Sequence, residues 1–183
     1  MNPNLRKLAI ALAATAALSG PVLAASASDP ITEADVLAAE TLWGDGIVTI
    51  GTTFTEGGDY KAAAAEHIAK LYAYGDGTVL FKPTKAAEDE FRETPDEALS
   101  YFVGGGEPED HGFAIQPWTK VRFENDGIVI GKDAATAMGN YYFTDAKTGK
   151  EVKVDFTMAF KRAADGHLEL FAHHSSLPYV PKH

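Results

Sequence analysis

The sequence predicts an α+β fold in which helices precede an antiparallel sheet. Apolar residues recur at near-helical spacing between Val36 and Ile50 and again in the segment that ends near Val103. From Trp118 onward the period changes to two, which is typical of strands with one buried face. Helices followed by a run of strands favour a layer of helices on one face of the sheet.

Three helix starts carry recognisable caps. Thr32, with Asp35 three residues later, is a capping-box pair for the first helix, although glycines within residues 44–51 weaken that prediction. Asp59 can cap a second helix over residues 60–72. Residues 94–97 (Thr-Pro-Asp-Glu) combine a cap, a proline at the first helical position and a glutamate at the third.

The elements between and after these helices follow from local pattern. A short apolar piece over residues 79–81 stops at a proline, and residues 84–92 are interpreted as a short helix. Four longer strands are expected after residue 118, with a tight hairpin turn at residues 125–127 (Asn-Asp-Gly). A strongly curved antiparallel sheet wrapped over three helices makes a cone with a pocket at its mouth, which is the arrangement of nuclear transport factor 2 (NTF2-like).

The first 27 residues have the pattern of a secretory signal peptide. Arg6 and Lys7 precede an apolar run, and small residues then provide a cleavage site after Ala27, with residues 22–24 (Val-Leu-Ala) as the alternative. We expect one mature domain over residues 28–183, in the periplasm or secreted, with no later segment long enough to span a membrane. The formal charge of −10 becomes more negative by two when this segment leaves, which argues against nucleic acid and anionic membranes as partners. The absence of cysteine excludes disulfides and thiolate chemistry.

The last predicted strand carries two histidines and two serines in succession, at residues 173–176. Side chains alternate along a strand, so His173 shares a face with Ser175, and His174 shares the other with Ser176. One pair can line a cavity while the other meets solvent or a second subunit, and the pattern does not choose between them. Adjacent histidines diverge, and no His-x-His or His-Glu-x-x-His motif occurs, so a dedicated zinc site is not expected.

Other polar and aromatic residues complete the predicted pocket. Thr119 is in register with Val121 and Phe123 and is therefore expected on the apolar face, where its hydroxyl needs a partner. Gly139 and Ala137 leave room for the phenol of Tyr141. Three further residues are expected near the pocket as an apolar lining: Phe102, Phe113 and Trp118. Tyr142 on the opposite strand face and His111 on the preceding loop are secondary candidates.

Several stretches of the chain resemble the iota-class carbonic anhydrases. They are LFKPTKA (80–86), ALSYFVGG (98–105), DHGFAIQPWTKVRFEN (110–125), AMGNYYFTD (137–145) and HHSSLP (173–178). The resemblance implies an NTF2-like fold, a homodimer, and reversible hydration of CO2 to bicarbonate and a proton. It implies a pocket with a threonine, a tyrosine and a histidine–serine pair, carried here by Thr119, by Tyr141 or Tyr142, and by one pair of the terminal motif. Members of this class with and without zinc or manganese are described, so no cofactor is predicted and a metal is left open.

Two other functions are compatible with the sequence. The cone can act as a small-ligand-binding or oligomerisation domain without catalysis, in which case the terminal motif would affect assembly alone. An isomerase or cyclase of the ketosteroid-isomerase type would need a carboxylate within the apolar pocket. Asp155 lies two residues after Lys153, so the two share a strand face, and that face is expected to meet solvent. This placement ranks the isomerase or cyclase chemistry third.

Overall fold

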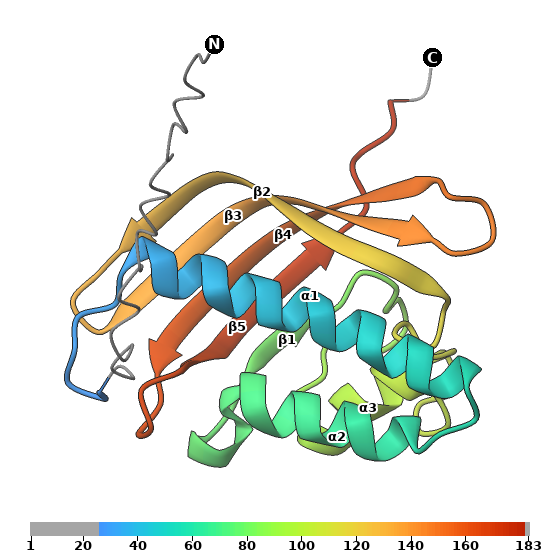
Figure 1. Ribbon diagram of the computed structural model, residues 1–183, viewed down its shortest axis with the longest axis horizontal. Coiled ribbons are helices and arrows are strands. Elements are labelled where there is room, and N and C mark those ends of the chain that lie inside the picture. The colour runs from blue at the N-terminus through green and yellow to red at the C-terminus, as the bar shows by residue number, and fades with distance from the viewer. Residues whose placement is uncertain (1–25, 182–183) are drawn as a thin grey trace, which may run out of the picture.

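The computed structural model describes residues 26–181, so nearly all of the predicted signal segment lies outside the described part. The helical elements are α1 (Glu33–Thr55), α2 (Tyr60–Leu71), the 3-10 turn η1 (Ala73–Asp76) and α3 (Pro95–Val103). The strands are β1 (Leu80–Lys82), β2 (Trp118–Ile130), β3 (Ala134–Asp145), β4 (Glu151–Arg162) and β5 (Leu168–Ser176). They form one sheet in the order β1-β5-β4-β3-β2, with α1 crossing its strands (Figure 1). The predicted α+β class is confirmed.

The sheet is mixed, whereas a purely antiparallel sheet was expected. β2, β3, β4 and β5 pair antiparallel, but the short edge strand β1 lies parallel to β5, with Phe81 opposite His173. A parallel neighbour needs a long crossover, and here the chain from β1 to β5 runs through α3 and the other three strands. The loop that follows β1 is thereby brought to the end of β5.

The helix caps were predicted correctly. Both capping boxes, at Thr32 and Thr94, are formed in both directions, and the Asp59 side chain accepts from the first turn of α2. The short helix predicted over residues 84–92 is wrong. Backbone N–H groups of residues 87–89 are taken by the carboxylate of Glu109 instead, so this segment is a side-chain-capped loop.

Glycine within α1 permits close packing rather than ending the helix. A Cβ at Gly46 would lie 2.1 Å from Nδ1 of His67, a buried residue on α2. The cost of glycine in a helix, about 1 kcal/mol relative to alanine, is therefore offset by an approach that no other residue allows. The glycines that weakened the helix prediction are therefore explained by the contact between α1 and α2.

The predicted hairpin turn at residues 125–127 is also wrong. β2 continues through this segment, with Asn125 opposite Gly139 and Gly127 opposite Met138, so the irregularity is a β-bulge. The chain reverses instead between β2 and β3, where the N–H of Gly131 donates to the carbonyl of Ala134 at 2.8 Å. The facing Gly139 accommodates the bulge, because a Cβ there would lie 2.2 Å from the carbonyl oxygen of Glu124.

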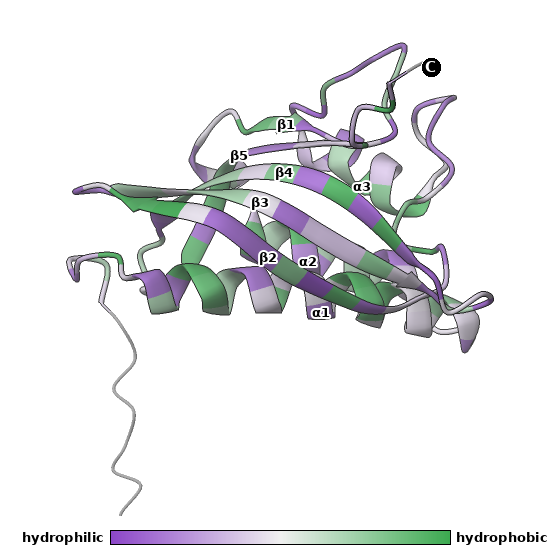
Figure 2. Cartoon of the chain, turned by 90° about the horizontal axis from the view of Figure 1, so that it is seen from above, coloured by the Kyte–Doolittle hydropathy of each residue, from purple (hydrophilic) through white to green (hydrophobic). Residues whose placement is uncertain are grey.

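The core lies between the sheet and the helices. Figure 2 shows the sheet bowed over α1 and α2, which agrees with the predicted cone. Its buried members include aromatic rings from helices and strands, among them Trp43, Tyr72, Phe81, Phe102 and Tyr141. Within residues 26–181, none of the helices has the length and apolar character to cross a membrane.

Candidate active site

A buried histidine near the end of β5 organises the polar part of the core. The side chain of His173 is 1% exposed and is stacked on Phe81, with ring centroids 5.1 Å apart and planes at 12°. Trp43 meets the same imidazole edge-on at 5.3 Å. Burial among these rings lowers the pKa of His173 to about 3, and the neighbouring His174 and His67 add to that effect. The imidazole is therefore neutral at physiological pH.

A β-bulge decides which histidine points inward. Leu170 pairs with Phe160 and Ala172 pairs with Ala159, so Phe171 is an extra residue in β5. Strict alternation would place His173 on the face opposite Leu170, but the extra residue returns it to the same buried face. His173 and Ser175 are buried, whereas His174 is exposed. The inner face of β5 therefore carries the His173–Ser175 pair.

Both nitrogens of His173 contact tyrosines. Nδ1 lies 2.9 Å from the hydroxyl oxygen of Tyr72, which itself accepts from Nε1 of Trp43 at 2.9 Å. Nε2 lies 3.5 Å from the hydroxyl oxygen of Tyr141 on β3. Tyr72 ends α2 and Trp43 lies in the middle of α1, so two helices and two strands converge on one imidazole.

A second pair of hydroxyls lies beside this group. The hydroxyl of Thr84 donates to Oγ of Ser175 at 2.9 Å. Burial raises the pKa of Tyr141, and the nearby hydroxyls of Ser175 and Thr84 offset part of that rise. Thr84 directly follows Pro83 at the end of β1. Its loop is held by Arg92, which is fully buried and bonds the carboxylate of Asp110 through two nitrogens at 3.2 and 2.7 Å. An Arg–carboxylate fork of this type fixes orientation as well as position.

Tyr101 on α3 supplies a hydroxyl without a partner. It is buried beside Thr84 and the backbone of Lys85, yet it makes no hydrogen bond of good geometry. Burial raises the pKa values of Tyr72, Tyr101 and Tyr141 well above their usual range, so all three phenols keep their protons. A buried polar group without a partner normally costs stability. The Tyr101 hydroxyl is therefore available to a small polar ligand.

These groups share one chemical capacity. Four hydroxyls, from two tyrosines, a threonine and a serine, lie close together, one of them contacts the neutral imidazole of His173, and the walls around them are aromatic. Such an arrangement can hold a water molecule and a small oxygen-containing ligand and can donate hydrogen bonds to negative charge that develops on that ligand. We call Thr84, Tyr101, Tyr141, His173 and Ser175 the hydroxyl–imidazole cluster.

Thr119 lies outside this cluster, which corrects its predicted placement. The pairing of β2 with β3 shifts between Trp118 and Lys120, so Thr119 is the extra residue of a bulge and does not share a face with Val121 and Phe123. Its side chain is exposed, and its hydroxyl donates to the carbonyl of Thr144 at 3.4 Å. The threonine whose hydroxyl lies in the cluster is Thr84.

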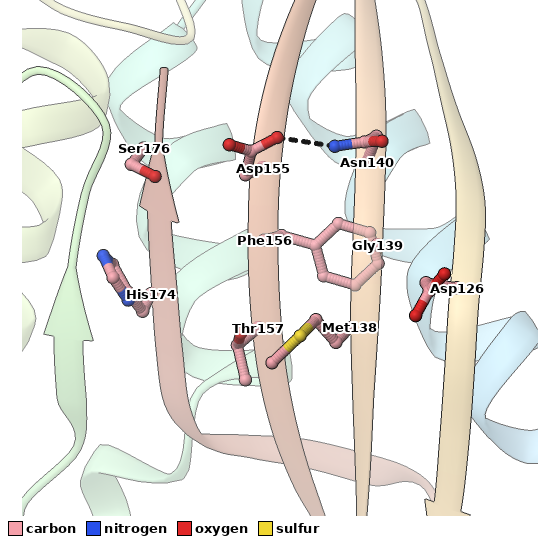
Figure 3. A pocket seen from close by; sticks show the side chains of 9 residues that line it. All are labelled: Asp126, Met138, Gly139, Asn140, Asp155, Phe156, Thr157, His174 and Ser176. Atoms are coloured by element: carbon pink, nitrogen blue, oxygen red, sulfur yellow. Dashed lines mark hydrogen bonds between the residues drawn. The ribbon is translucent and has the colours of Figure 1, made fainter. Parts of the chain in front are cut away.

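Four other predicted residues also lie elsewhere. Tyr142 is on the opposite face of β3, stacked under the guanidinium of Arg122 at 3.7 Å, and His111 is exposed on its loop. His174 and Ser176 line a hollow of about 320 Å3 on the outer face of the sheet. Figure 3 shows them there with Asp155, which accepts from Asn140 at 2.6 Å. Asp155 thus faces away from the core, as predicted.

The three aromatic residues predicted as a lining are buried near the cluster. Phe113 stacks on Tyr101, with centroids 5.5 Å apart and planes at 15°. Phe102 packs against Phe81, with ring centroids 5.9 Å apart. The indole N–H of Trp118 donates to the carbonyl oxygen of Phe113 at 2.8 Å. Phe113 thus contacts a member of the cluster directly, whereas Trp118 acts through Phe113.

Sequence reasoning missed four residues that the structure brings to this site: Trp43, Tyr72, Thr84 and Tyr101. Trp43 lies within the helical apolar pattern of residues 36–50, and Tyr72 is the last residue of the predicted second helix. Thr84 and Tyr101 lie within two of the stretches that carry the family resemblance, LFKPTKA and ALSYFVGG. That location was the available signal for them.

The cluster contains a single metal-ligating side chain of the usual kinds. Within residues 26–181, no three His, Cys, Asp or Glu side chains are grouped so that they could hold a metal ion together. His67, which is near His173, is buried with an unbonded Nε2, and burial lowers its pKa to about 4.

Comparisons with known proteins give a consistent result. Residues 34–177 match the family model of the metal-independent carbonic anhydrases. A metal-independent carbonic anhydrase from Nostoc sp. is 44% identical over 173 residues, which cover 92% of this chain and 82% of that protein. The family description gives no support to the zinc or manganese alternative.

Solved structures agree. A cyanobacterial iota-carbonic anhydrase complexed with bicarbonate superposes with a TM-score of 0.81 at 43% identity, covering 90% of this chain and all of that one. An NTF2-like protein from Novosphingobium aromaticivorans superposes with a TM-score of 0.52 at 11% identity, covering 79% of this chain and 80% of that one, and shows the fold alone. The match over most of its length shows that the chain belongs to the metal-independent carbonic anhydrase family.

Proposed function

We propose that this chain catalyses the reversible hydration of CO2 and that the hydroxyl–imidazole cluster is where the reaction takes place. The observation that carries the assignment is the Thr84–Ser175 hydroxyl pair beside His173 and Tyr141, in a chain 43% identical to an iota-carbonic anhydrase that binds bicarbonate. The unbonded hydroxyl of Tyr101 adds a donor at the same place. Relatives with this name support the activity, and the geometry supports the residues.

The cluster fits the chemistry of hydration. CO2 is apolar and linear, so aromatic walls such as Phe81 and Phe113 suit it. As the oxygen of water bonds to carbon, one carbon–oxygen π pair moves onto an oxygen, where negative charge grows. The hydroxyl of Tyr101, which has no partner, can donate to that charge, and a positioned donor is worth roughly 10²- to 10³-fold in rate.

The water must lose one proton for each bicarbonate formed. His173 is a poor acceptor for this proton at neutral pH, because burial lowers the pKa of its imidazole to about 3. The Thr84–Ser175 pair can instead accept the proton from water at one oxygen while releasing its own, so that the proton reaches solvent along hydroxyl groups. We assign His173 the role of orienting the cluster and Thr84 and Ser175 the role of holding the attacking water.

The experiment is a stopped-flow CO2 hydration assay on the mature protein. Activity is expected in the presence of a chelator, and Ser175→Ala and Thr84→Val should each lower kcat/KM at least tenfold. Thr119→Val is the matched control, because that threonine is exposed and lies outside the cluster. Failure of the wild-type protein to hydrate CO2 above buffer, with or without added zinc or manganese, would leave the non-catalytic ligand-binding domain as the better account.

We also propose that the protein is a homodimer joined through the outer face of the sheet. Large apolar side chains are exposed on or beside that face, including Leu80 at 65%, Met138 at 54% and Phe91 at 53%. Leu80 and Phe91 also line an apolar hollow of about 520 Å3. Light scattering should give twice the chain mass, and Leu80→Glu should shift the protein to a monomer.

Export is the last part of the proposal. The positively charged start, apolar run and small residues before Ser28 support cleavage after Ala27 and a periplasmic or secreted location. Mass spectrometry of the protein from its native cells should find an N-terminus near Ser28 in the exported fraction. An intact Met1 on the purified protein would contradict this.

A further inference from the structure

A chain of two hydrogen bonds leads to His173, and it starts at Trp43, whose side chain can donate but cannot accept. The indole of Trp43 has one N–H and no acceptor, and this N–H is directed at the hydroxyl oxygen of Tyr72 at 2.9 Å. Trp43 and Tyr72 are both buried, so water does not compete for these groups. The direction of the first hydrogen bond in the chain is therefore fixed by chemistry.

The direction of the second bond follows from the first. The hydroxyl proton of Tyr72 needs an acceptor, because a buried donor without one loses about 1–3 kcal/mol. The group at hydrogen-bond distance from that oxygen, besides the indole donor, is Nδ1 of His173 at 2.9 Å. Nδ1 must then accept, and in a neutral imidazole the proton is carried by the other nitrogen.

We propose that Trp43 and Tyr72 are positioning residues that lock His173 in the tautomer with its proton on Nε2, so that the imidazole presents an N–H donor to the reaction site. This inference rests on the proposed function. His173 then acts as a donor in the cluster and not as the base that removes a proton from water.

The rest of the cluster is oriented by this tautomer. The N–H at Nε2 is directed at the oxygen of Tyr141, so the hydroxyl proton of Tyr141 turns toward Thr84 and Ser175. The Nε2–oxygen distance of 3.5 Å makes a weak hydrogen bond. The N–H at Nε2 of His173 is therefore available to an oxygen of bicarbonate or of the transition state. In this arrangement the hydrogen-bond donors of the cluster favour a growing negative charge.

The experiment reads the tautomer directly by NMR of protein labelled with nitrogen-15 histidine. The two ring nitrogens of a neutral histidine resonate far apart when one carries the proton, and a His67→Gln variant removes the other buried histidine for assignment. We expect Nδ1 of His173 to be unprotonated and Nε2 protonated in the wild-type protein. Tyr72→Phe should shift the signals toward the other tautomer or a mixture and should lower kcat roughly tenfold or more.

Two controls separate tautomer control from general loss of packing. Tyr74→Phe removes a neighbouring phenol hydroxyl that bonds the carbonyl of Arg92 at 2.7 Å, and it should leave both tautomer and kcat unchanged. Trp43→Phe keeps an aromatic ring but removes the fixed donor, so it should loosen the tautomer as Tyr72→Phe does.

Each failure has its own signature. A wild-type His173 with its proton on Nδ1 overturns the inference whether or not the protein hydrates CO2. A Tyr72→Phe variant with a changed tautomer and unchanged kcat also overturns it while leaving the proposed function intact. A wild-type protein that shows the expected tautomer without hydration overturns the proposed function, and with it the catalytic role of the tautomer.

Discussion

Thr84 and Ser175 are 91 residues apart in the chain, yet their hydroxyl oxygens lie 2.9 Å apart. The contact exists because β1 adds to the edge of the sheet parallel to β5, which sets Phe81 opposite His173 and carries the next few residues past the end of β5. Residues 83–92 are then held in place by Arg92, Asp110 and Glu109. An edge strand of three residues thus builds one half of the proposed site.

This relationship predicts that Thr84 and Ser175 act as one unit. Thr84→Val and Ser175→Ala each remove the same hydrogen bond, so each should lower kcat/KM by roughly 10²-fold. The double variant should be little worse than either single variant, because residues in direct contact are non-additive. The measurement is a double-mutant cycle on CO2 hydration, with unfolding by urea as a check on folding. Losses that multiply in the double variant would show that the two hydroxyls act independently.

A second prediction concerns the contact between α1 and α2. Gly46→Ala places a methyl group on His67, since the added Cβ would lie 2.1 Å from Nδ1. We expect a loss of about 1–3 kcal/mol in the free energy of unfolding, the usual cost of overpacking. In a His67→Ala background the same change should stabilise instead, by up to about 1 kcal/mol, because alanine favours helix over glycine. Urea unfolding of the four proteins tests this reversal of sign, and a loss of equal size in both backgrounds would contradict the steric explanation.

How far the sequence predicts this protein depends on whether the governing signal is local. Caps at Thr32, Asp59 and Thr94 are local patterns and were predicted correctly, as was the period-two pattern of the strands. Two β-bulges change which face a residue lies on: one removes Thr119 from the inner face, and the other returns His173 to it. Neither bulge is visible in the alternation of apolar and polar residues along the sequence. Their effect is decided by pairing with the neighbouring strand, which a single sequence does not display.

The same reasoning explains the tyrosines. Tyr72 and Tyr101 fit the apolar pattern of core positions, and most of each side chain is packed in the core. What makes them functional is the position of one hydroxyl relative to His173 or Thr84, and that depends on how α2 and α3 pack on the sheet. Family resemblance located the segments, whereas the roles within them required the three-dimensional arrangement.

A third prediction is a loss of stability as pH falls, caused by buried neutral histidines. Burial lowers the pKa values of His67 to about 4 and of His173 to about 3, below the usual value of 6.5. Between those values and 6.5 the unfolded chain binds more protons than the folded one, so stability falls as pH decreases through this window. Each unit of difference between the folded and unfolded pKa corresponds to about 1.4 kcal/mol, so both residues add to this fall in stability.

The pH dependence can be assigned to one residue by substitution. The free energy of unfolding, measured in urea between pH 7.5 and 4.5, should depend less steeply on pH in His67→Gln than in the wild-type protein. His111→Gln serves as the control, because the side chain of His111 is solvated in the folded and unfolded states. An unchanged slope in His67→Gln would show that His67 is accessible to protons in the folded protein.

The last prediction concerns a carboxyl group buried between α1 and the bulge in β2. Glu40 is 1% exposed and accepts from Nδ2 of Asn125 at 2.7 Å, while its other oxygen and the side-chain oxygen of Asn125 have no partner. Burial raises the pKa of Glu40, and the Asn125 bond offsets this in part. A proton on Glu40 would let it donate to the free oxygen of Asn125, and a glutamine amide can make the same donation at any pH.

Glu40→Gln should therefore stabilise the protein at pH 8 by about 1 kcal/mol, the typical net value of a buried hydrogen bond. Because the folded state holds the Glu40 proton more tightly than the unfolded state, ionisation destabilises the wild-type protein as pH rises through the raised pKa. The advantage of glutamine should accordingly shrink as pH falls toward 4.5. Glu40→Leu is the matched comparison: it removes the charge but leaves both polar groups of the Asn125 side chain without a partner, and it should stabilise less than glutamine. Equal stability of the wild-type and glutamine proteins at pH 8 would mean that the Glu40 carboxylate is well solvated despite its position.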